Sequence, residues 1–118
     1  MKVENRTIFE NDNLYVLRGL DTDSIDLIYL DPPFNSNRTF EAPVGTEAAG
    51  ATFKDFWTLD DLDDTSHSEL AKRKPELYHA ISAAEFSHGK SMKAYLIMMS
   101  IRMPVSYTHL TLPTKRIV

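Results

Sequence analysis

The chain contains no cysteine among its 118 residues, which excludes disulfide bonds and thiolate metal sites. His67, His79 and His88 have no partners at the spacing of metal ligands, so no metal site is predicted. The longest apolar run, Tyr95 to Met99, is far too short to span a bilayer. The opening stretch MKVENRTIFEND has no apolar core behind its lysine and is not a signal peptide. These absences predict a cytoplasmic protein without a membrane partner.

An excess of positive charge is also lacking. Thirteen Lys and Arg residues stand against 17 Asp and Glu, which gives a formal net charge of −4. This balance counts against a complete nucleic-acid-binding surface within these residues. The 42% of hydrophobic and 25% of charged residues are ordinary for a soluble globular protein, and the length suffices for one small domain.

The N-terminal part combines two strand-like segments with a short helix. Arg6 to Glu10 is rich in β-branched and aromatic residues, which favours a strand. Leucines then recur at helical spacing over Asn13 to Leu20. Ile25 to Leu30 is an almost continuous apolar run, typical of a parallel strand covered on both faces. The pattern predicts a strand, a helix and a strand in a right-handed crossover.

The remaining chain is less regular until its last third. The long stretch after Phe34 mixes glycine, proline, acids and aromatics and is predicted to be a functional loop. Pro75 is expected to open a helix that ends at Gly89. Ser91 precedes a second helical stretch to Met103, which is apolar almost all round and is therefore expected to be buried.

The predicted second strand ends abruptly in Asp31-Pro32-Pro33-Phe34. In open α/β sheets, ligands bind beyond the carboxyl ends of the strands. Each proline fixes its own φ, lacks an N–H group and pushes the residue before it into an extended conformation. The carbonyl oxygens of Asp31 and Pro32 therefore stay free of any helix. A rigid cluster of acceptors beside a flat ring suits a planar group with an N–H₂ donor, such as the exocyclic amine of a base.

The segment NDNLYVLRGLDTDSIDLIYLDPPFNSN resembles the opening of the beta-class DNA methyltransferases that methylate exocyclic amines. PVGTEAAGATFKDFW and HGKSMKAYLIMMSIRM resemble further parts of that family, so the similarity covers Thr7 to Met103. The resemblance implies a partial Rossmann-like, S-adenosylmethionine-dependent methyltransferase fold, an incomplete parallel sheet flanked by helices. It also implies that residues 1–104 are the N-terminal part of a DNA methylase N-4/N-6 domain.

The family activity implied is methyl transfer from S-adenosylmethionine to the exocyclic amine of a flipped DNA base. Asp31 would accept one N–H group of that amine and the Pro32 carbonyl region the other, while Pro33 stiffens the turn and Phe34 stacks on the base. Because Asp stands first in the motif, adenine N6 is favoured over cytosine N4. DNA is thus the expected partner, with a restriction endonuclease of the same system as a further candidate.

Other residues are candidates for supporting roles. Asn35, Asn37 and Arg38 follow the motif directly and are predicted either to contact the DNA backbone or flipped nucleotide or to form an ordinary surface loop. Asp12 is predicted either to lie near the cofactor or to serve as a helix N-cap. The F-x-G-x-G loop that forms the main cofactor site in this family is absent from the sequence.

Two alternatives remain open beside a DNA adenine or cytosine-N4 methyltransferase. RNA base methyltransferases share the tetrapeptide, but they usually place a glycine-rich loop upstream, and only thirty residues precede Asp31 here. The alternative of another class is an inactive truncated fragment with no enzymatic function.

The C-terminal stretch raises a separate question. VSYTHLTLPT, from Val105 to Thr114, back-translates to a DNA string that resembles the transposon-end adapter used in sequencing libraries. Residues 105–118 are therefore predicted to be a non-native tail, with a natural β-strand as the alternative because the segment alternates polar and apolar residues. Without Lys115 and Arg116 the net charge of −4 becomes −6.

Overall fold

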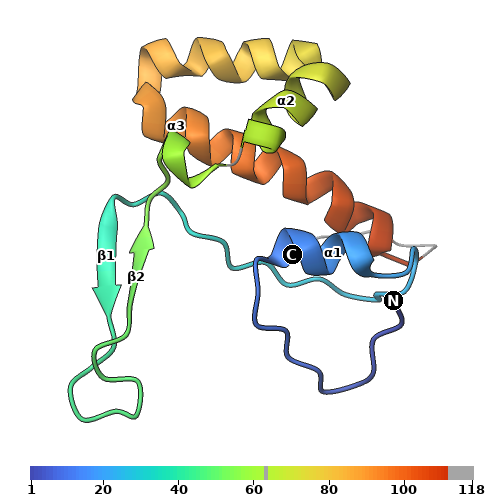
Figure 1. Cartoon of the computed structure of the whole chain (residues 1–118), viewed down its shortest axis with the longest axis vertical. Coiled ribbons are helices and arrows are strands. Elements are labelled where there is room, and N and C mark those ends of the chain that lie inside the picture. The colour runs from blue at the N-terminus through green and yellow to red at the C-terminus, as the bar shows by residue number, and fades with distance from the viewer. Residues whose placement is uncertain (63, 112–118) are drawn as a thin grey trace. The chain divides into compact units, whose positions relative to one another are not determined.

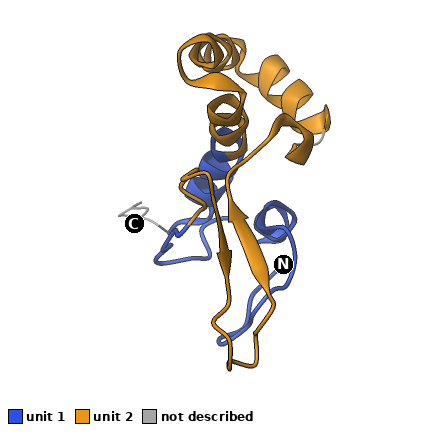
Figure 2. Ribbon diagram, turned by 90° about the vertical axis from the view of Figure 1, so that its left-hand side faces the viewer, with its two compact units in different colours: residues 1–31, 99–118 blue, residues 32–98 orange. Residues whose placement is uncertain are grey.

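The computed structural model describes residues 1–62 and 64–111 and combines helices with one small sheet (Figure 1). The elements, in chain order, are α1 (Asn13–Gly19), β1 (Arg38–Glu41), β2 (Thr52–Asp55), the 3₁₀ helix η1 (Leu59–Asp61), α2 (Asp64–Arg73) and α3 (Pro75–His109). The chain forms two compact units (Figure 2). Unit 1 consists of residues 1–31 and the chain from residue 99 onward, and unit 2 of residues 32–98.

In unit 1, a charged contact joins α1 to the last turns of α3. The carboxylate of Asp12 caps α1 by accepting a hydrogen bond from the Leu14 N–H at 2.8 Å. The guanidinium of Arg102 donates to both carboxylate oxygens of Asp12 at 2.9 Å and to Oδ1 of Asn13 at 2.8 Å. Such charge-assisted pairs are among the stronger hydrogen bonds of proteins. The helix predicted here and the N-cap role of Asp12 are confirmed, with the helix ending at Gly19.

A second contact in unit 1 joins the segment after α1 to the end of α3. The Ile25 N–H donates to the His109 carbonyl at 2.9 Å, and the Ile25 carbonyl accepts from the Thr111 N–H at 2.9 Å. This is an isolated parallel bridge between Ile25 and Leu110. Leu110 is fully buried, so part of the predicted non-native tail packs into unit 1, while residues 112–118 lie outside the described residues.

The two predicted parallel strands are wrong for this structure. Neither Arg6–Glu10 nor Ile25–Leu30 is a strand, and large apolar side chains in both are exposed: Ile8 (93%), Leu27 (67%) and Tyr29 (77%). A parallel strand needs neighbours beside it and cover on both faces. Among the described residues, Leu110 and Thr111 contact the start of this run at Ile25 and Asp26, but no parallel sheet is formed. The coarser expectation of a mixed helix-and-sheet protein is confirmed.

The sheet that the structure contains lies in unit 2, in the stretch predicted to be a loop. β1 and β2 pair antiparallel, with Arg38 opposite Asp55 and Glu41 opposite Thr52. On one face the rings of Phe40 and Phe53 stack with their centroids 5.1 Å apart, as expected for aromatic residues at directly paired positions. Each strand has only four residues, which is too short for the alternation to stand out in the sequence.

The predicted helix start at Pro75 and the break at Gly89 are confirmed, but the predicted end at Met103 is wrong, because α3 continues through Pro104 to His109. The β-strand alternative for the stretch from Val105 is likewise wrong as far as His109. α3 begins at Pro75, and Gly89 breaks its helical geometry with φ at +84°. A left-handed φ of this kind favours glycine because it has no Cβ. Burial after Gly89 is only partial, because Met103 is 36% exposed although Ala94, Ile97 and Met98 are buried. Among residues 1–62 and 64–111, no helix combines the length and hydropathy needed to cross a membrane.

Leu110 provides a test of the packing in unit 1. Its side chain is fully buried, whereas Leu27 in the same unit is 67% exposed. Leu110→Ala should lower the free energy of unfolding by about 2–5 kcal/mol, since truncation of a buried leucine removes its packing contacts. Leu27→Ala, the matched control, should change it by less than about 0.5 kcal/mol. Urea unfolding of the 118-residue chain measures both. Equal losses in the two variants would contradict the described burial.

Candidate functional site

The Asp31–Phe34 motif lies in irregular chain, and the division of the sequence into two units falls within it. Asp31 is the last N-terminal residue of unit 1, and Pro32 is the first residue of unit 2. The side chain of Asp31 is exposed, and no described residue forms a hydrogen bond or an ion pair with its carboxylate. In unit 2, Pro32 and Pro33 are half-buried, whereas Phe34 is 69% exposed. The predicted acceptor and the predicted stacking ring are therefore both open to solvent.

Asn35 holds the residues after the motif to two other segments of unit 2. Its Oδ1 accepts hydrogen bonds from the backbone N–H of Trp57 at 3.2 Å and from the hydroxyl of Ser91 at 3.0 Å. Trp57 follows β2, and Ser91 lies in α3 two residues after the Gly89 break. The side-chain oxygen of Asn35 is thus engaged within the unit. Contact of this residue with a nucleic acid remains a prediction.

Asp55, at the end of β2, holds the same turn from its other side. The residue is only 5% exposed, and its Oδ2 accepts a hydrogen bond from the Ser36 N–H at 3.1 Å. Its main-chain carbonyl accepts from the Asn37 N–H, also at 3.1 Å. Asp55 therefore accepts hydrogen bonds from two consecutive N–H groups of the turn, one with its side chain and one with its main-chain carbonyl.

Electrostatics in this turn favour the ionised form of Asp55. Hydrogen bonding from the Ser36 side chain lowers the pKa of the Asp55 carboxyl below its ordinary value, and burial acts in the opposite direction. The backbone N–H groups of Ser36, Phe34 and Asn35 lower that pKa further. Successive amides that converge on one point form an anion-binding concavity. Here the anion is a carboxylate of the chain itself.

The turn requires unusual backbone geometry at two asparagines. Asn35 has φ at +57° and Asn37 at +61°, in the left-handed region that asparagine tolerates better than most residues. Asn37 and Arg38 are exposed, and Arg38 opens β1 opposite Asp55. The structure leaves these two predicted DNA-contacting side chains on the surface beside the turn.

Sequence reasoning missed Asp55. The available signal was its position between aromatic residues, with Phe53 before it and Phe56 and Trp57 after it. Three aromatics so close together are unusual in a polar surface loop. Asp12, by contrast, was a candidate from the sequence, but its carboxylate caps α1 and pairs with Arg102. A contact between Asp12 and a cofactor remains a prediction.

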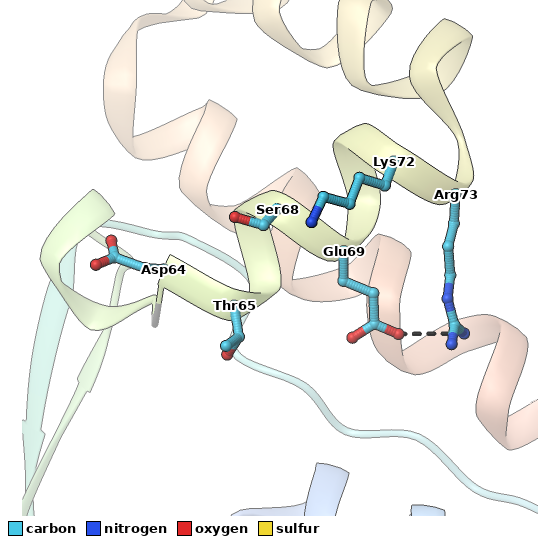
Figure 3. A pocket seen from close by; sticks show the side chains of 6 residues that line it. All are labelled: Asp64, Thr65, Ser68, Glu69, Lys72 and Arg73. Carbon is cyan, nitrogen blue, oxygen red and sulfur yellow. Dashed lines mark ion pairs between the residues drawn. The ribbon is translucent and has the colours of Figure 1, made fainter.

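Hollows also occur away from the motif within the described residues. Figure 3 shows a hollow along α2, lined by Asp64, Thr65, Ser68, Glu69, Lys72 and Arg73. All six come from one helix face, and an ion pair of 3.2 Å between Glu69 and Arg73 engages two of them. Over residues 1–62 and 64–111, no group of three or more His, Asp or Glu side chains is placed to hold a metal ion.

Comparisons with family models, with curated proteins and with solved structures found no match to this chain. The assignment of a function therefore depends on the residues and on their geometry.

The lowered pKa of Asp55 gives a pH test of the turn. A carboxyl whose folded pKa lies below its ordinary value of 3.8 stabilises the folded state fully above that value, and the contribution is lost as the pH falls through the lower folded pKa. In the 118-residue chain, the amide resonance of Ser36 should therefore titrate with a midpoint below 3.8. Asp55→Asn should abolish this transition. A midpoint at or above 3.8 would contradict the described contact.

Proposed function

We propose that this chain carries the amine-holding half of the active site of a DNA methyltransferase, most simply one that methylates adenine N6. The observation that carries the proposal is the open state of the Asp31–Phe34 motif. Asp31 offers an exposed carboxylate that no described residue engages, and Phe34 offers a largely exposed ring. Two prolines, which cannot donate hydrogen bonds, join the acid to the ring.

These groups suit the chemistry of an exocyclic amine. The nitrogen of such an amine is a poor nucleophile because its lone pair is delocalised into the ring. Acceptors at Asp31 and at the Pro32 carbonyl would bind the two N–H bonds, return electron density to the nitrogen and fix its direction. Orientation and electrostatics of this kind contribute much of the catalysis in sites without a covalent intermediate. Phe34 would stack on the base after it leaves the duplex.

The residues of this chain do not by themselves fit the cofactor. S-adenosylmethionine would supply the methyl group as an electrophilic carbon, but the sequence has no F-x-G-x-G loop to hold it. Arg102 already engages Asp12, the acid predicted to lie near the cofactor. The proposal therefore assigns the cofactor site, and the basic surface that DNA requires, to residues outside this sequence.

The finer fold assignment belongs to the same proposal. The exposed Ile8, Leu27 and Tyr29 lie in the two segments that the sequence pattern makes strands. Exposed apolar side chains of this size usually mark a surface that another element covers. We assign these segments to a Rossmann-like parallel sheet whose remaining strands lie outside the described residues.

Asp31→Ala tests the catalytic assignment in the protein encoded by the complete genomic locus. The substitution should abolish methyl transfer to DNA and leave S-adenosylmethionine affinity within about twofold, because Asp31 is assigned to the amine and not to the cofactor. Asp26→Ala, an exposed acid on the same segment, should retain activity. Radiolabelled methyl incorporation and calorimetry measure the two effects. Near-normal turnover of Asp31→Ala would overturn the assigned role.

Phe34 tests base stacking. Phe34→Ala should weaken binding of the flipped base by about 1–3 kcal/mol, whereas Phe34→Tyr and Phe34→Trp should retain activity because each keeps a flat ring. Phe86→Ala serves as the control, since Phe86 is also highly exposed, at 96%, but lies in α3 away from the motif in sequence. Unchanged kinetics in Phe34→Ala would rule out a stacking role.

A further inference from the structure

The turn that follows the motif is built around Asp55, which neither the motif nor the resemblance assigns to the site. Asp55 is 5% exposed, and its Oδ2 accepts the Ser36 N–H at 3.1 Å. Its Oδ1 is buried without a hydrogen-bond partner among the described residues. Burying a carboxylate is costly unless its charge is compensated. A packing role would be served at lower cost by an apolar side chain, so the buried acceptor itself needs an explanation.

The explanation lies in the conformation of the turn. Two left-handed asparagines, Asn35 and Asn37, bracket Ser36 and turn successive amides inward. Without Asp55, the Ser36 N–H would lose its acceptor within the chain, and the turn could relax toward a less strained backbone. Asp55 supplies the acceptor from the end of β2, where pairing with Arg38 fixes its position.

We propose that Asp55 is a positioning residue that fixes the turn after the motif and so holds the Phe34 ring in its exposed, base-accepting orientation. Asn35 contributes to the same function, because its Oδ1 ties the turn to the backbone of Trp57 and to Ser91. The inference rests on the proposed methyltransferase function for its consequence, but the geometry of the clamp stands apart from it. Asp55 touches neither substrate nor cofactor in this assignment.

The first experiment tests the clamp in the 118-residue chain without any assay of activity. Chymotrypsin cleaves after aromatic residues, so opening of the turn should expose the Phe34–Asn35 bond to the protease. Cleavage of the Phe9–Glu10 bond in unit 1 serves as an internal reference. Asp55→Leu, which keeps the branched shape but removes the acceptor, should raise cleavage after Phe34 relative to Phe9 by about 5- to 30-fold. Asp55→Asn, whose amide oxygen still accepts the Ser36 N–H, should raise it by less than about 5-fold.

A matched control comes from the same unit. Glu85 also carries a carboxylate that is engaged within the unit, by Lys93 Nζ at 2.8 Å, but both residues lie in α3. Glu85→Gln should leave the cleavage ratio unchanged. Combining Asp55→Leu with Asn35→Ala should produce less than the product of the two single effects, because both side chains hold one turn.

The second experiment tests the consequence in the protein of the complete locus. Asp55→Leu should lower kcat for methyl transfer by about 5- to 30-fold while the Kd for S-adenosylmethionine stays unchanged, and Asp55→Asn should recover most of kcat. An unchanged cleavage ratio in Asp55→Leu would overturn the clamp. A raised ratio with normal kcat would reduce Asp55 to a structural residue and overturn the positioning role. Failure of the unsubstituted protein to methylate any nucleic acid would refute the proposed function, while the cleavage ratio would still decide the clamp.

Discussion

The geometry around the candidate site depends on one buried carboxylate. Asp55 ends β2, pairs with Arg38 across the hairpin and accepts two successive amides of the turn between the motif and β1. Pairing in the hairpin fixes the position of Asp55, and the Asp55 carboxylate accepts the Ser36 N–H of the turn. The ring of Phe34 stays exposed because the chain after it is held on one side by Asp55 and on the other by Asn35. The left-handed conformation of the two asparagines is compatible with this arrangement while residue 55 supplies an acceptor for the Ser36 N–H.

Features with a local cause could be predicted from the sequence. The cap of α1 needs one acid two residues before Leu14, the start of α3 needs Pro75, and the break within α3 needs Gly89. The motif itself was also visible, since two consecutive prolines stiffen the chain in any fold. Features that depend on distant partners could not be predicted. Asp55 joins the turn through its contact with Ser36, and Asn35 is held by Trp57 and Ser91, which are more than twenty residues away in sequence.

The failed strand predictions have the same physical origin. A continuous apolar run such as Ile25–Leu30 specifies what the segment can bury but not which segment covers it. In this structure the described neighbour of Ile25 is Leu110, which lies in the stretch that back-translates to an adapter sequence. An edge with unpaired backbone groups accepts whatever strand-like segment is near it. The bridge therefore shows that the backbone of Ile25 can pair with a parallel segment. It does not depend on whether that segment is native.

The central claim is that Asp31 and Phe34 hold the exocyclic amine of a DNA base for methylation. The most direct measurement incubates DNA with the protein encoded by the complete locus and S-adenosylmethionine that carries an isotopic label on its methyl group, then digests the DNA and identifies the labelled nucleoside by mass spectrometry. The account predicts label on an exocyclic nitrogen, with N6-methyladenine as the product. Label on a ring carbon, label in RNA alone, or no label in any nucleoside would contradict it.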